Sequence, residues 1–85
     1  MKKSVISVKS MVETYVAYGL DDSTWEMFYM MRCHNLITSE VWTEFFNTCR
    51  GWQIDPEDGL TIIDTERNDK IIYQADEYGV FVKVK

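Results

Sequence analysis

The fold of this chain is decided at residues 47–52, where the sequence reads Asn47-Thr48-Cys49-Arg50-Gly51-Trp52. Before Gly51 the apolar residues recur every three or four positions, which is the spacing of one face of an α-helix. After Gly51 they alternate, with turn residues between the runs, which is typical of β-strands. The chain of 85 residues is therefore predicted to be a single domain with a helical half, residues 4–50, and a β half, residues 52–85.

The first predicted helix has a regular apolar stripe. Ser10 and Glu13 have the spacing of a capping box at its start, and Gly19 is expected to end it. Residues 4–8 are interpreted as an extra helical turn, with a short strand as the alternative. The stripe consists of Val8, Met11, Val12, Tyr15 and Val16.

The second predicted helix follows the capping-box sequence Ser23-Thr24-Trp25-Glu26 and is apolar almost all round. Such a helix is usually buried on several sides, by its own domain or by a partner. A domain of this size seldom encloses a helix completely, so part of this surface is expected to be left for binding. A short connection leads to a third helix, which Thr38 or Ser39 is expected to cap and Gly51 to end.

Three strands are predicted after the turn Asp55-Pro56-Glu57-Asp58-Gly59, at about residues 60–66, 70–75 and 79–85. Short connections make them an antiparallel meander. The predicted fold class is therefore α+β, with two or three N-terminal helices packed on one face of a C-terminal three-stranded antiparallel β-meander.

The pairing of these strands determines which side chains face the helices. A four-residue loop over residues 76–79 pairs Ala75 with Val80, and the outward face then carries three large apolar side chains. They are interpreted either as covered by another part of the chain or as a docking surface. These residues are Ile62, Ile72 and Phe81.

The net charge is −5, and the charged residues are unevenly distributed along the chain. Residues 10–82 hold all 14 acids but only four bases, which gives this stretch a net charge of −10. Most of this surface would repel a phosphate backbone, so no direct nucleic-acid binding is expected. A basic protein partner would be attracted. The alternative is that the charge only keeps the protein from aggregating.

The sequence predicts neither a metal site, nor a cofactor, nor an enzyme. Cys33, His34 and Cys49 are its only soft metal ligands, whereas a structural zinc site usually needs four in close pairs. The third predicted helix carries Glu40 and Glu44 where a DNA-reading helix would carry basic or amide side chains. Motifs for phosphate binding or hydrolysis are absent from the sequence.

The location is predicted from two features. The sequence holds no apolar run near the roughly 20 residues that a membrane span needs. Lys9 and Glu13 interrupt the first apolar stretch, so no secretion signal is expected. A cytoplasmic protein with free thiols is therefore the expectation.

In size and acidity the chain is similar to small inhibitors encoded by phages and mobile elements, including anti-CRISPR and anti-restriction proteins. This similarity of composition implies a non-enzymatic protein that binds a basic nucleic-acid-handling enzyme. The residues expected to bind the partner are Asp55, Glu57, Asp58, Asp64, Glu66, Asp69, Ile72, Asp76, Glu77 and Phe81. The alternative function is a homodimeric scaffold or regulatory subunit, closed through Trp25, Met27, Met30 and Met31.

Overall fold

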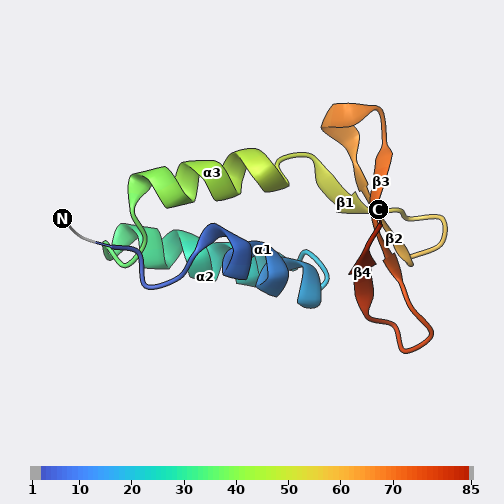
Figure 1. Ribbon diagram of the computed structural model, residues 1–85, viewed down its shortest axis with the longest axis horizontal. Helices are drawn as coiled ribbons and strands as arrows, with labels where there is room; N and C mark the ends of the chain where they lie inside the picture. The colour runs from blue at the N-terminus through green and yellow to red at the C-terminus, as the bar shows by residue number, and fades with distance from the viewer. Residues whose placement is uncertain (1–2, 85) are drawn as a thin grey trace. The chain divides into compact units, whose positions relative to one another are not determined.

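Two compact units make up the chain, Met1–Cys49 and Arg50–Lys85, and each is described by itself. The computed structural model describes residues 3–84. Three helices form the first unit and four antiparallel strands form the second (Figure 1). The α+β class, with helices before the sheet, is thus confirmed. A single domain with the helices packed on the sheet stays a prediction.

The helical unit contains α1 (Val8–Ala17), α2 (Asp22–Cys33) and α3 (Ser39–Cys49). The predicted cap of α3 is confirmed, because Thr38 Oγ1 accepts a hydrogen bond from the Val41 backbone N at 3.3 Å. The predicted cap of α1 is wrong by one turn. Ser7 holds that position, and its Oγ accepts from the Ser10 backbone N at 3.2 Å.

The segment before α1 is neither a helical turn nor a strand, so both interpretations are wrong for residues 4–7, and only Val8 of the range 4–8 lies in α1. Its polar groups bond to the loop between α2 and α3 instead. Val5 N donates to Leu36 O at 2.9 Å, and Ser4 Oγ accepts from Thr38 N at 2.8 Å. These bonds span more than thirty residues, and the local sequence carries no signal for them.

The core of the helical unit is built around the fully buried ring of Phe45. Its centroid lies 5.1 Å from that of Trp25, 5.4 Å from that of Phe28 and 5.9 Å from that of Tyr15. Met11 on α1 is fully buried as well. The apolar stripe that predicted α1 therefore supplies side chains to the core, as its spacing indicated.

The second unit is an antiparallel sheet with the order β1-β2-β3-β4. Its strands are β1 (Trp52–Ile54), β2 (Thr61–Asp64), β3 (Lys70–Ala75) and β4 (Phe81–Lys83), and a 3-10 turn, η1 (Thr65–Arg67), follows β2. The prediction of three strands is therefore wrong, because β1 was missed. Three residues are too few to establish an alternating pattern, and β1 becomes a strand by pairing with β2.

The register of β4 differs by one residue from the prediction. Ala75 lies opposite Phe81, not opposite Val80. The side chain of Asp76 accepts a hydrogen bond from Val80 N at 3.0 Å, which draws Val80 into the loop. Because a shift of one residue turns a strand over, Phe81 now shares a face with Ala75 and is half-buried, while Val82 is exposed.

Ile62 is 0% exposed, so its burial fits the interpretation as a covered residue and excludes the docking surface. It lies between Ile54 of β1 and Tyr73 of β3. A bulge opposite Ile62 and Ile63 gives β3 one extra residue, Ile72, which is half-buried. The exposed large apolar residues on and beside β3 and β4 are Ile71, Tyr78, Val80, Val82 and Val84.

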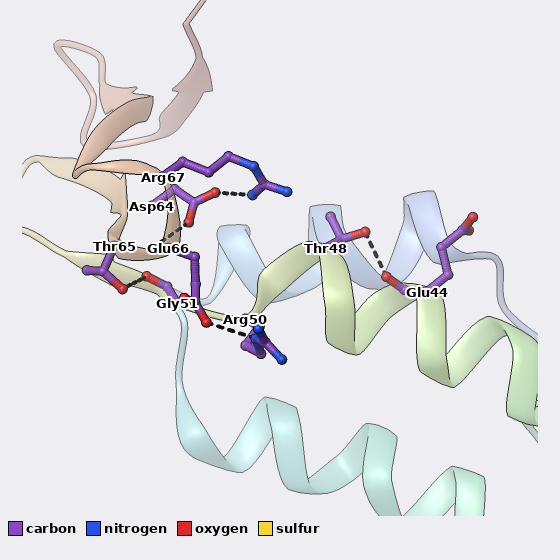
Figure 2. Close-up of polar contacts among 8 residues, drawn as sticks. All are labelled: Glu44, Thr48, Arg50, Gly51, Asp64, Thr65, Glu66 and Arg67. Carbon is purple, nitrogen blue, oxygen red and sulfur yellow. Dashed lines mark hydrogen bonds and ion pairs between the residues drawn. The ribbon is translucent and has the colours of Figure 1, made fainter.

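Gly51 is held tightly against η1. Its carbonyl accepts hydrogen bonds from the backbone N of Thr65 at 2.9 Å and from the Thr65 hydroxyl at 2.7 Å, and Figure 2 shows the second of these. The φ angle of Gly51 is +86°, and a Cβ placed there would clash with Cγ of Glu66. Both the backbone conformation and the available space therefore require glycine at this position.

We expect Gly51→Ala to destabilise the protein by more than the ~1–2 kcal/mol that a positive φ alone imposes on alanine. The excess arises because the new methyl group must displace the Glu66 side chain and the adjacent backbone. Gly79→Ala is the matched control, since Gly79 has a φ of +80° but nothing within 4 Å of its Cβ position. Urea unfolding gives both free energies, and equal losses would contradict the close packing at Gly51.

Candidate functional site

The antiparallel topology sorts the predicted partner-binding acids onto opposite ends of the sheet. The loops over residues 55–60 and 76–80 leave one end, and the connection over residues 65–69 leaves the other. The first end is called the acidic end below. It carries the carboxylates of Asp55, Glu57, Asp58, Asp76 and Glu77.

The two loops of the acidic end are joined at their bases. Ala75 N donates a hydrogen bond to Leu60 O at 2.7 Å, which connects the start of one loop to the end of the other. Figure 1 shows the two loops leaving the sheet in different directions. Their carboxylates are therefore spread over one end of the sheet. Within residues 3–84, no three acidic, histidine or cysteine side chains are placed to hold a metal ion.

Aspartates fix the shape of the 55–60 loop. Asp55 Oδ1 accepts from Glu57 N at 2.9 Å, and Asp58 Oδ1 accepts from Leu60 N at 2.8 Å. The other oxygen of Asp58 accepts from the Thr61 hydroxyl at 2.9 Å. The bonds from Leu60 N and the Thr61 hydroxyl lower the pKa of Asp58, because they stabilise its charged form.

Asp76 organises the 76–80 loop in the same way. Its Oδ1 accepts from Tyr78 N at 2.9 Å and from Val80 N at 3.0 Å. Its backbone N also donates to Val80 O at 2.9 Å. The carboxylate is thus held at the surface in a fixed position, next to the exposed side chain of Glu77.

The opposite end of the sheet is neutralised by arginines (Figure 2). Arg50 Nε donates to Glu66 Oε1 at 2.8 Å, and Arg67 donates to Asp64. Asp64 is 2% exposed and also accepts from Glu66 N at 3.0 Å, so its carboxylate serves the fold of η1. Of the acids predicted at this end, only Asp69 is both exposed and outside an ion pair.

Among residues 3–84, no ion pair occurs at the acidic end. Both ion pairs lie at the opposite end of the sheet, and Lys70 and Lys83 stand opposite Asp64 and Tyr73 in the strands. An uncompensated negative charge therefore remains at the acidic end. It produces a local field that attracts cations and basic surfaces.

The acidic end carries exposed apolar residues in addition to the predicted Ile72 and Phe81, whose role in partner binding stays a prediction. Ile72 and Phe81 are half-buried, whereas three large side chains in the two loops are exposed, with Tyr78 reaching 82%. The sequence did not indicate these residues, because Leu60 and Val80 fell inside the predicted strands 60–66 and 79–85, and Tyr78 fell in a predicted turn. The feature of the sequence that could have indicated them is their position next to the acids of the turns. They are Leu60, Tyr78 and Val80.

The two thiols have contrasting surroundings. Cys49 is buried, and this burial raises the pKa of its thiol to about 12. Its thiol is therefore protonated and a poor nucleophile at neutral pH. Cys33 is exposed at the end of α2.

Comparison with known proteins finds no family model, no curated protein and no solved structure that matches the chain. Among the described residues, no helix combines the length and the apolar character that crossing a membrane requires.

We expect Asp58 to titrate below an ordinary aspartate, and Thr61→Val to raise its midpoint by removing one hydrogen bond to the charged form. A lowered pKa means that Asp58 stabilises the fold above its ordinary pKa, and that this contribution is lost as the pH falls through the lowered value. Carboxyl 13C shifts followed by NMR give the midpoints, with Thr61→Ser as the control that keeps a hydroxyl. An unchanged midpoint in Thr61→Val would contradict the role of the hydroxyl.

Proposed function

We propose that this chain is a small acidic protein-binding module whose acidic end docks on a basic protein. The observation that carries the proposal is the coincidence, at one end of the sheet, of uncompensated carboxylates and exposed apolar side chains. The carboxylates would attract a basic partner, and the apolar side chains would supply contact area that excludes water.

The shape of the loops supports this function. Asp55, Asp58 and Asp76 are each held by backbone N–H groups, so their charges are positioned before a partner arrives. A preorganised surface loses less conformational freedom on binding than a mobile one. Tyr78 adds an aromatic side chain, a residue type that is enriched in the centres of interfaces.

The class of partner that fits best is an enzyme that handles nucleic acids. Such an enzyme presents a basic groove to phosphates, and carboxylates spread over two loops offer it a comparable series of negative charges. The proposed role is therefore inhibition, of the kind exerted by anti-CRISPR or anti-restriction proteins of phages and mobile elements. A cytoplasmic location and the absence of catalysis belong to the same proposal.

The test compares two variants with the same change in net charge. The first carries Asp55→Asn, Glu57→Gln, Asp76→Asn and Glu77→Gln, whose amide oxygens still accept the loop hydrogen bonds. The control carries Glu13→Gln, Glu40→Gln, Glu44→Gln and Asp69→Asn, all at exposed positions outside the acidic end. Affinity capture from the native host with the unmodified chain identifies the partner, which is then purified for kinetic measurements.

We expect the acidic-end variant to associate with this partner about tenfold more slowly at 50 mM salt, with a flatter salt dependence and weaker inhibition of the partner's activity. The control should stay close to the unmodified chain. Equal losses in both variants would mean that net charge alone matters, and would refute the acidic end as the docking surface.

The second candidate function is a homodimeric scaffold or regulatory subunit, and the exposure of Met27 and Met30 on α2 supports it. Trp25 and Met31, the other residues expected in that interface, are half-buried. This function predicts a dimer mass by analytical ultracentrifugation at micromolar concentration, reduced to a monomer by Met27→Lys with Met30→Lys. A monomer at all concentrations would eliminate it.

A further inference from the structure

Four aromatic rings form a continuous strip between α2 and α3, which is called the aromatic face. The ring centroids of Trp25 and Trp42 are 5.5 Å apart, those of Trp25 and Phe46 are 5.8 Å apart, and those of Tyr29 and Trp42 are 5.9 Å apart. Because the residues alternate between the two helices, the strip bridges them. No part of the acidic end belongs to this face.

The aromatic face is supported from beneath and open above. Trp25 and Trp42 are half-buried and contact the core ring of Phe45 at centroid distances of 5.1 Å and 5.8 Å. Tyr29 and Phe46 are 52% and 40% exposed. A ligand would therefore meet rings whose positions the core already fixes, and would immobilise few side chains on binding.

Carboxylates border this face on α2. Asp22 precedes Trp25 by three residues, and Glu26 precedes Tyr29 by three, so helical spacing puts each acid beside a ring. Both acids are exposed, and no ion pair occurs in the described part of the helical unit. Burial raises the pKa of Tyr15, whose ring is 5.5 Å from that of Trp25, and the negative charge of Asp22 also raises it.

The combination of open rings and nearby carboxylates suits a cation. The face of an aromatic ring attracts an ammonium or guanidinium group, and tryptophan does so most strongly. A planar guanidinium also stacks on a ring while donating hydrogen bonds to a carboxylate at its edge. Arg32 on α2, the nearest candidate in sequence, makes no ring contact within the described residues.

We propose that the aromatic face binds an arginine-bearing peptide segment, with guanidinium groups stacked on the rings and paired with Asp22 and Glu26. A second copy of the chain fits less well, because it would bring its own Asp22 and Glu26, and a net charge of −5, to the contact. This site lies in the helical unit and does not rest on the acidic end. It gives the protein a second surface for basic partners.

The test uses the full chain and a tri-arginine peptide as the probe. The indole N–H resonances of Trp25 and Trp42 should shift and saturate during an NMR titration, while that of Trp52 in the sheet unit stays in place. A tri-citrulline peptide has nearly the same shape without the charge and should bind on the order of tenfold more weakly. Equal binding of the two peptides would overturn the proposal.

Exposed rings supply the first pair of variants. Tyr29→Ala and Phe46→Ala should each weaken tri-arginine binding about three- to tenfold, because each removes a ring from the strip. Tyr18→Ala is the matched control, since Tyr18 is exposed at the end of α1 and makes none of the ring contacts of the strip. Undiminished binding by Tyr29→Ala and Phe46→Ala would overturn the proposal.

The acids supply the second comparison. Asp22→Asn with Glu26→Gln should weaken binding, whereas Glu40→Gln with Glu44→Gln should not, although the net charge changes equally. Glu40 and Glu44 lie two residues on either side of Trp42, and therefore on the opposite side of α3. Shifts confined to residues 55–60 and 76–80 would assign the peptide to the acidic end, and a concentration-dependent dimer that covers the rings would assign the face to a second copy. Either result would refute this site.

Discussion

The sheet depends on one repeated interaction, in which an aspartate carboxylate accepts the backbone N–H two residues further along the chain. Asp55, Asp58, Asp64 and Asp76 each make this bond, in or directly before each connection between the strands. Strands of three to six residues offer few ladder bonds of their own. The short aspartate side chain supplies the missing acceptor and sets where each strand resumes.

The same interaction separates acids that fold the chain from acids that remain available to a partner. At one end of the sheet the buried carboxylate of Asp64 accepts hydrogen bonds from the Glu66 backbone N–H and from Arg67. The neighbouring Glu66 side chain forms an ion pair with Arg50. At the other end the aspartates make their backbone bonds, and no ion pair joins them to a cation within residues 3–84. Their backbone hydrogen bonds are made while their negative charge is not paired among the described residues, so under the proposed function the same aspartates would both form the turns and bind the partner.

The sequence was sufficient to predict those features of the fold that depend on neighbouring residues in the chain. The stripe of α1, the Thr38 cap and the limits of β3 follow from spacing and residue type, and each is found. It was insufficient where hydrogen bonds between residues further apart in the chain determine the backbone conformation. The Asp76 carboxylate accepts a hydrogen bond from Val80 N, and β4 pairs one residue later than predicted. Leu36 O accepts a hydrogen bond from Val5 N, where the sequence predicted a helical turn. The same holds for the candidate site. The sequence showed where the acids are, but the order of the strands showed which of them lie at the same end of the sheet.

The difference between the two cysteines has a practical consequence. Since Cys49 is buried with its thiol protonated and Cys33 is exposed, a maleimide dye or a nitroxide added at neutral pH will attach to a single position of the unmodified chain. That position is the last residue of α2, a helix that carries half of the aromatic face. The molecule thus contains its own attachment point for a spectroscopic reporter beside that face, and no engineered residue is needed to install one.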